Sequence, residues 1–134
     1  ATTWAQAGRA IPCLGTTHAD YFDGPVPVTA ALSDEAIAGA YEAETGAALC
    51  AALAGLDPER YPGALVRNHG PFCWGRDAAA AAHHAVILEA IAKMAYQTLA
   101  LAGEAAMPRD LHQRHFSRKH GAGAYYGQPG KSEQ

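Results

Sequence analysis

The sequence predicts an α/β or α+β domain, in which a small sheet is covered by helices. Short apolar segments bounded by glycine or proline, such as residues 64–66, have the length of buried strands. Longer segments with apolar residues at three- and four-residue spacing, above all residues 78–102, have the period of amphipathic helices. A chain of 134 residues with 49% hydrophobic content is large enough to enclose one such core.

The first part of the chain mixes helical and extended signals. Residues 1–8 are expected to form the end of a helix, with Gly8 closing it. Residues 11–14 should lead into a strand or strand edge over residues 15–20. The prolines of Pro-Val-Pro-Val at 25–28 favour extended backbone.

A helix is expected to begin at about Asp34. Ser33 is a good N-cap, and Asp34 and Glu35 place acidic side chains in the first turn. Gly46 is expected to interrupt this helix, which should then continue to a stop at Gly55.

The strand expected over residues 64–68 stops at His69, where Gly70 and Pro71 should turn the backbone. An imidazole at the end of a core strand is held on a rigid element and points out of it, which suits a metal ligand. A lone histidine is a weak signal, so the neighbouring motifs have to decide its role.

Two further helices are expected in the second half. Asp77 should cap a helix over residues 78–102, and Pro108 should open another that runs to about His120. The apolar stripe of the first comprises His84, Ile87, Leu88, Ile91, Ala95 and Leu99. The polar tail is expected to be unstructured beyond Tyr126 unless a partner fixes it.

Composition narrows the classes of function. The net charge is −3 and no broad basic face stands out, which disfavours a nucleic-acid partner. No apolar run approaches the roughly twenty residues of a membrane span, and no charged-then-apolar leader is seen. Cys13, Cys50 and Cys73 have no paired spacing, which is typical of reduced thiols in a cytoplasmic protein.

Three motifs in this order carry a resemblance to a known family: Thr-Thr-His-Ala-Asp-Tyr-Phe at 16–22, His-Gly at 69–70, and Tyr-Tyr-Gly-Gln at 125–128. They resemble the L-ribulose-5-phosphate 4-epimerases, a branch of the class II (zinc-dependent) aldolase family. The resemblance implies a three-layer α/β/α sandwich with a largely antiparallel central sheet. It also implies that residues 1–134 are the C-terminal portion of a single domain, preceded by a part that holds a His-x-His motif.

The resemblance makes His69 the third histidine ligand of a zinc ion, with the other two ligands in the His-x-His motif. Manganese or cobalt would also suit imidazole ligands. His83 and His84 offer no replacement pair, because adjacent side chains on a helix diverge. The isolated chain is therefore expected to be metal-free and inactive.

The resemblance also implies the remaining roles. Asp20 and Tyr126 would be acid–base groups on opposite faces of the substrate, with Tyr126 delivered from a neighbouring subunit of a homotetramer. His115 would position one of them, and Arg118 would balance the phosphate of the substrate. Because Asp20 lies between small and aromatic residues, partial burial is expected to raise its pKa.

The implied activity interconverts L-ribulose 5-phosphate and D-xylulose 5-phosphate by breaking and re-forming the C3–C4 bond, in arabinose or ascorbate catabolism. One alternative is a class II aldolase of the fuculose-phosphate type, which would release its aldehyde and lack the paired acid–base groups. Another is a non-catalytic adducin-like interaction domain, in which the metal histidine is dispensable. Retention of Asp20, His69 and Tyr126 together favours the epimerase.

Overall fold

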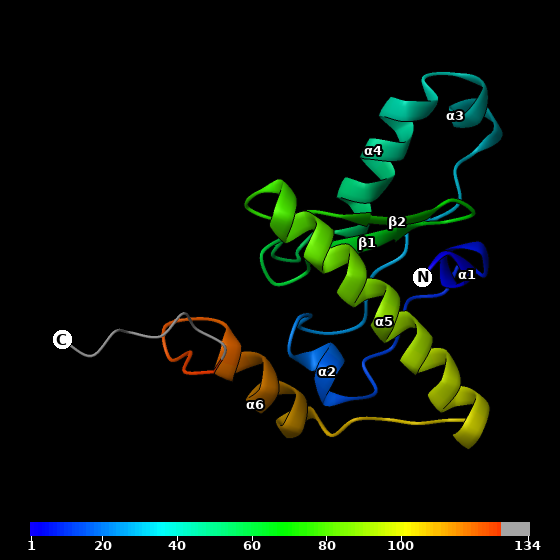
Figure 1. Ribbon diagram of the computed structural model, residues 1–134. Coiled ribbons are helices and arrows are strands. Elements are labelled where there is room, and N and C mark those ends of the chain that lie inside the picture. The colour runs from blue at the N-terminus through cyan, green and yellow to red at the C-terminus, as the bar shows by residue number, and fades with distance from the viewer. Residues whose placement is uncertain (127–134) are drawn as a thin grey trace.

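The computed structural model describes residues 1–126, and Figure 1 shows how their helices and strands are arranged. In chain order these elements are α1 (Thr2–Gln6), α2 (Thr16–Ala19), α3 (Asp34–Ala38), α4 (Tyr41–Ala52), β1 (Gly63–Val66), β2 (Gly70–Cys73), α5 (Ala78–Ala102) and α6 (Arg109–Lys119). The mixture of helices with an antiparallel pair of strands agrees with an incomplete α/β fold.

The sheet is a hairpin of β1 and β2, with Gly63 opposite Cys73 and Val66 opposite Gly70. The expected strand over 64–68 is therefore too long, and the expected turn at Gly70 and Pro71 is wrong. The turn lies at residues 67–69, where Asn68 adopts a positive φ of 64°. A short polar side chain tolerates this left-handed conformation, so Asn68 closes the hairpin and Gly70 begins β2.

Residues 26–28 are extended, as expected from the prolines, whereas Pro25 lies in a bend. Val28 forms a parallel bridge to Leu65, and Ile11 forms an antiparallel bridge to Val26. These bridges attach the N-terminal part of the chain to β1, and Thr29 adds a hydrogen bond from its amide to the Leu65 carbonyl at 2.9 Å.

α5 has the bounds that the sequence predicts. The Asp77 side chain accepts a hydrogen bond from the Ala80 amide at 2.7 Å, which is the N-cap interaction. Its buried residues are Leu88, Ile91, Ala92 and Ala95. The Trp4 indole of α1 donates to the Ala92 carbonyl at 3.0 Å, so α1 packs on the middle of α5. The core lies between these two helices and the hairpin.

Two expectations about the helices are wrong. Residues 15–20 hold the short helix α2 rather than a strand. The break between α3 and α4 falls at Gly39, with φ −97° and ψ −128°, and Gly46 lies inside an uninterrupted α4. A single glycine costs an exposed helix only about 1 kcal/mol, which the surrounding alanines tolerate.

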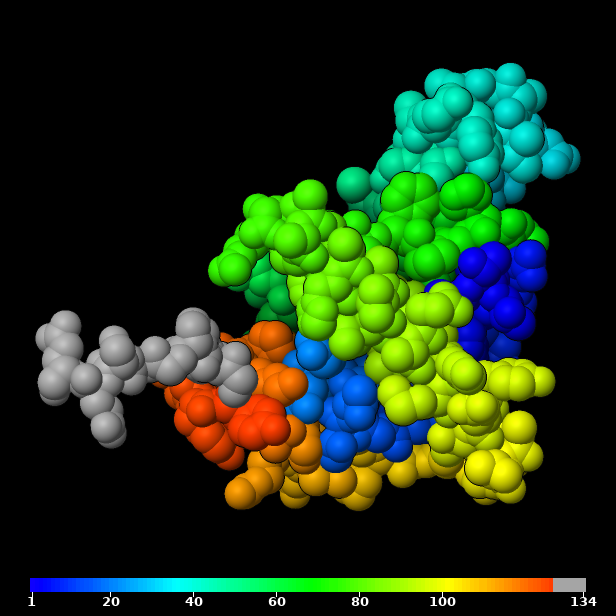
Figure 2. Space-filling model, viewed as in Figure 1, coloured from blue at the N-terminus to red at the C-terminus, as the bar shows by residue number. Residues whose placement is uncertain are grey.

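The outer face of α5 exposes large apolar side chains next to a few charged ones: Val86, Met94, Tyr96 and Leu101 lie on it with Glu89 and Lys93. Among the described residues, α5 alone is long and apolar enough to cross a membrane by length and composition, with 22% of the relevant window buried. This corrects the expectation that no apolar run reaches that length. Figure 2 shows α5 running across the front of the molecule, while α3 and α4 project from the top. The inner stripe of α5 packs on the hydrophobic core through Leu88, Ile91, Ala92 and Ala95.

Candidate functional site

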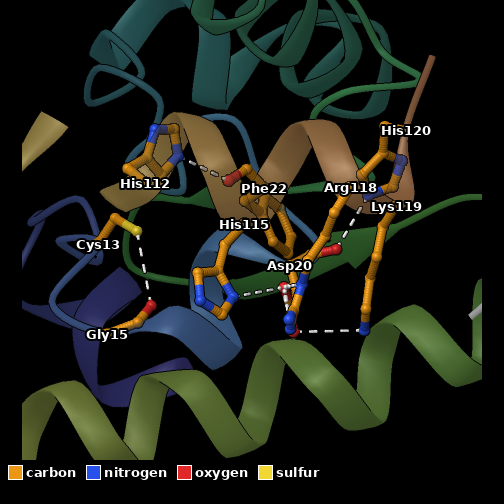
Figure 3. A network of polar contacts seen from close by, with 9 residues as sticks. All are labelled: Cys13, Gly15, Asp20, Phe22, His112, His115, Arg118, Lys119 and His120. Carbon is orange, nitrogen blue, oxygen red and sulfur yellow. Dashed lines mark hydrogen bonds and ion pairs between the residues drawn. The ribbon is translucent and has the colours of Figure 1, made fainter. Parts of the chain in front are cut away.

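The Asp20 carboxylate is the centre of a cluster of basic side chains from α6 (Figure 3). His115 Nδ1 lies 3.0 Å from Asp20 Oδ1, and Arg118 Nη2 lies 3.1 Å from each carboxylate oxygen. Lys119 Nζ is 3.3 Å from Oδ2. The side chain of Asp20 is only 12% exposed, so these contacts take the place of most of its water.

The sequence builds this cluster from two short helices. Asp20 is the C-cap of α2, and its amide donates to the Thr16 carbonyl at 2.9 Å. On α6, His115 and Arg118 are three residues apart and therefore share a face. Phe116 is buried and anchors α6 against the rest of the domain. The helical spacing of α6 thus brings two basic side chains onto one carboxylate.

The Asp20 pKa lies below its ordinary value. Burial, the largest single effect, raises the pKa, but the hydrogen bonds from Arg118 and His115 and the charge of Lys119 together lower it by more. The expected increase in this pKa is therefore wrong in sign. Burial was anticipated correctly, whereas the cations brought by α6 could not be placed from the sequence. Asp20 is ionised at neutral pH.

Tyr126 lies beside the same cluster. Its amide donates to the Arg118 carbonyl at 2.9 Å, and the Arg118 guanidinium lies 4.3 Å from the centre of its ring. Lys119 Nζ is 5.6 Å from that ring centre. The ring is 51% exposed, so it contacts both cations while remaining open to a partner. Gly127 and Gln128, the last two residues of the tyrosine motif, lie outside the described residues.

Arg118 therefore lies between the two groups for which acid–base roles are expected. The structure brings together four of the five candidate residues: Asp20, His115, Arg118 and Tyr126. Sequence reasoning missed Lys119, although its position next to Arg118 near the end of α6 was a signal that could have identified it. The Arg118 guanidinium binds the Asp20 carboxylate in this structure, and its role as a phosphate ligand stays a prediction.

His69, the fifth candidate, lies apart from this cluster. It is exposed in the hairpin turn, with its ring 5.8 Å from that of Phe72. It borders a cavity of about 280 Å³ between the hairpin and α4. Within residues 1–126, no hydrogen bond, ion pair or ring contact joins His69 to Asp20, and no three histidine, cysteine or carboxylate side chains gather as a metal site.

His83 and His84 have structural contacts. The His83 ring packs 5.7 Å from that of Tyr21, and His84 Nδ1 lies 2.6 Å from the Trp74 carbonyl oxygen, to which it donates. Each of the two rings thus has a contact of its own within the described part of the chain.

The sequence of residues 1–96 matches a family described as the Class II Aldolase and Adducin N-terminal domain. The chain belongs to this family. It is 52% identical over 130 residues to the "L-ribulose-5-phosphate 4-epimerase UlaF" of Salmonella paratyphi C and to that of Salmonella choleraesuis. The protein of the same name from Salmonella typhi is 51% identical over 130 residues.

These matches cover 96% of this chain and 57% of each relative. The chain thus spans little more than half the length of the curated relatives that it matches. Because so little of the chain is left uncovered, the matches extend over α6 and Tyr126, which lie beyond the family match. The resemblance to epimerases therefore includes both sides of the Asp20 cluster.

Proposed function

We propose that the polypeptide carrying this sequence is an L-ribulose-5-phosphate 4-epimerase, which interconverts L-ribulose 5-phosphate and D-xylulose 5-phosphate. The observation that carries this proposal is the ionised Asp20 carboxylate, which His115 and Arg118 hold on a chain that also bears the half-exposed Tyr126. The 52% identity to proteins named as this epimerase supports it. Cytoplasmic location and a role in arabinose or ascorbate catabolism belong to the same proposal.

The reaction requires proton transfer at the C4 oxygen. The substrate carbonyl is two carbons from C4, so the C4 hydrogen is not acidic and its direct removal is disfavoured. Cleavage of the C3–C4 bond leaves an aldehyde that can rotate and present its other face before the bond re-forms. Each face then needs its own group to accept or return the proton of the C4 oxygen.

Asp20 and Tyr126 have the complementary protonation states for this task. The α6 cations keep Asp20 ionised, so it can accept a proton from the C4 hydroxyl. The phenol of Tyr126 can donate a proton on the opposite face. His115 Nδ1 lies 3.0 Å from Asp20 Oδ1 and would orient the carboxylate. The half-exposed Tyr126 ring suits delivery into the site of a neighbouring subunit, and we include a homotetramer in the proposal.

The metal of this proposal is zinc, with His69 as one ligand. The exposed ring of His69 is accessible to an ion, but catalytic zinc sites use three protein ligands. The described residues gather no such set, so they do not by themselves fit the metal. The roles assigned to this chain are therefore the binding and proton transfers around Asp20.

The alternatives make different demands on the site. A fuculose-phosphate-type aldolase would release the aldehyde and would not need a second acid–base group opposite Asp20. An adducin-like interaction domain would need neither group. The matches to epimerases across Asp20 and Tyr126 therefore favour the epimerase over both.

Product analysis tests the proposal directly. A chimaera in which this chain replaces the matching 57% of the Salmonella paratyphi C relative provides a polypeptide of full length. With zinc and L-ribulose 5-phosphate, we expect D-xylulose 5-phosphate without accumulation of glycolaldehyde phosphate. Stoichiometric release of glycolaldehyde phosphate would favour an aldolase, and absence of both products, with the unaltered relative active in parallel, would contradict the proposal.

A further inference from the structure

The loop from Asp20 to Gly24, which we call the Asp20 loop, is held by three imidazoles on alternate carbonyl groups. His120 Nε2 lies 2.9 Å from the Asp20 carbonyl oxygen. His112 Nε2 lies 3.2 Å from that of Phe22, and His18 Nε2 lies 2.8 Å from that of Gly24. Figure 3 shows the contacts of His112, which lies on α6, and of His120, the C-cap residue of that helix.

The chemistry of the carbonyl group requires a donor on Nε2 of all three rings. A carbonyl oxygen only accepts hydrogen bonds, so each ring must carry a hydrogen on Nε2 to bond it. The side chain of His18 is buried, with the residue 4% exposed, and its Nδ1 has no partner within the described residues. Burial lowers the pKa of His18 to about 4, which agrees with a neutral ring that serves only as a donor.

His18, which lies on α2, holds the Asp20 loop through its backbone as well as through its ring. Its carbonyl oxygen accepts hydrogen bonds from the Tyr21 and Phe22 amides, each at 3.0 Å, while its ring reaches Gly24. The same residue thus contacts both ends of the Asp20 loop. The edge of its ring also packs on Phe22, with 5.6 Å between ring centres.

His112 and His120 fix α6 against the loop. They lie on either side of the buried Phe116, whose ring centre is 6.4 Å from that of His112 and 4.3 Å from that of His120. A slip of α6 by one turn, about 5.4 Å, would break both contacts with the loop. His115 and Arg118, which bind the Asp20 carboxylate, are on the same helix, so the backbone contacts set the register of the side-chain contacts.

We propose that His18, His112 and His120 form an imidazole clasp, a set of positioning residues that holds the Asp20 carboxylate in place beside His115, Arg118 and Tyr126. The catalytic consequence rests on the function proposed above, whereas the clasp itself is a property of this chain. None of the three residues needs to touch the substrate. Their effect is to reduce the number of orientations that Asp20 can adopt.

The test separates hydrogen bonding from packing. His112→Phe and His120→Phe keep a ring beside Phe116 but remove the donor. His112→Gln and His120→Gln remove the ring but keep an amide donor near the position of Nε2. His84→Phe is the matched control, because His84 also donates to a carbonyl oxygen, that of Trp74, at 2.6 Å.

The first measurement is made on this chain by amide hydrogen exchange at Tyr21 and Phe22. We expect each Phe variant at the clasp to accelerate exchange there about fivefold, the effect of one lost hydrogen bond. The pKa of Asp20, followed by carboxylate NMR, should move toward its ordinary value. The Gln variants and His84→Phe should leave both readouts near those of the unaltered chain.

The second measurement uses the chimaera with the Salmonella relative. If Asp20 needs the clasp, the Phe variants should lower kcat about tenfold with little change in KM, and the Gln variants should restore most of it. Unchanged exchange and Asp20 titration in the Phe variants, or Gln variants that behave like Phe, would overturn the clasp. Faster exchange with an unchanged kcat would overturn its positioning role, whereas a chimaera inactive before any substitution would refute the proposed function alone.

Discussion

Acidification from pH 7 to pH 4 should destabilise this domain through His18. The ring is neutral when folded, because burial lowers its pKa from 6.5 to about 4. In the unfolded chain the same ring takes up a proton at about pH 6.5. The unfolded state therefore binds more protons between these two values, and the free energy of unfolding falls as the pH falls.

The magnitude follows from the two pKa values. Each unit of difference between the folded and unfolded states corresponds to about 1.4 kcal/mol. The span from 6.5 to about 4 thus corresponds to roughly 3 kcal/mol, a large part of the stability of a small domain. The neutral His18 ring thus adds this amount to the free energy of unfolding above pH 6.5. The added stability decreases as the pH falls toward 4 and changes no further below that.

Urea unfolding followed by tryptophan fluorescence at several pH values would measure this slope. His18→Gln removes the titrating group while keeping an amide donor toward the Gly24 carbonyl. The difference in the free energy of unfolding between the unaltered chain and this variant should therefore decrease as the pH falls from 6.5 to 4. Direct NMR titration of the His18 ring supplies the same information if that variant fails to fold. A titration midpoint of the His18 ring near pH 6.5 in the folded chain would refute the reasoning.

Two further predictions concern ion pairs and a helix cap. A double-mutant cycle with Asp20→Asn and Arg118→Met should give a coupling energy of about 1.5 kcal/mol, because both side chains are largely buried. The same cycle for Arg76 and Asp77, which are 90% and 54% exposed, should give about 0.3 kcal/mol, and equal couplings would contradict the account. Asp77→Ala should lower the free energy of unfolding by about 1 kcal/mol by removing the N-cap bond to Ala80, whereas Asp77→Asn should keep most of it. An equal decrease in the free energy of unfolding in both Asp77 variants would show that the lost N-cap hydrogen bond is not its cause.

Local signals in the sequence predicted the helices that have their own caps. Asp77 and Ser33 each accept a hydrogen bond from the amide three residues further on, and both helices begin where these caps place them. Pro108 likewise precedes α6 directly. Capping depends on a few adjacent residues, which is why it can be read without knowledge of the rest of the fold.

The Asp20 cluster is formed by long-range contacts that could not be predicted from the local sequence. Asp20 meets His115, which is 95 residues away, and its pKa is lowered by cations of α6 that local context does not reveal. The short helix α2 is held by the same long-range packing against α6 and was wrongly expected to be extended. The resemblance to epimerases supplied Asp20 and Tyr126 as expected acid–base groups, but the histidines that contact the carbonyl groups of the Asp20 loop became visible only in the structure.

The most direct test of the central claim is the turnover of Asp20→Asn compared with Asp23→Asn in the chimaera with the Salmonella relative. Both substitutions remove one carboxylate charge from the same loop, but Asp23 bonds Arg60, with 3.0 Å from its Oδ2 to Nε, rather than the α6 cluster. If Asp20 transfers the proton of the C4 oxygen, Asp20→Asn should lower kcat at least about 100-fold, while Asp23→Asn should stay within about threefold of the parent. Turnover of Asp20→Asn equal to that of Asp23→Asn would contradict the account.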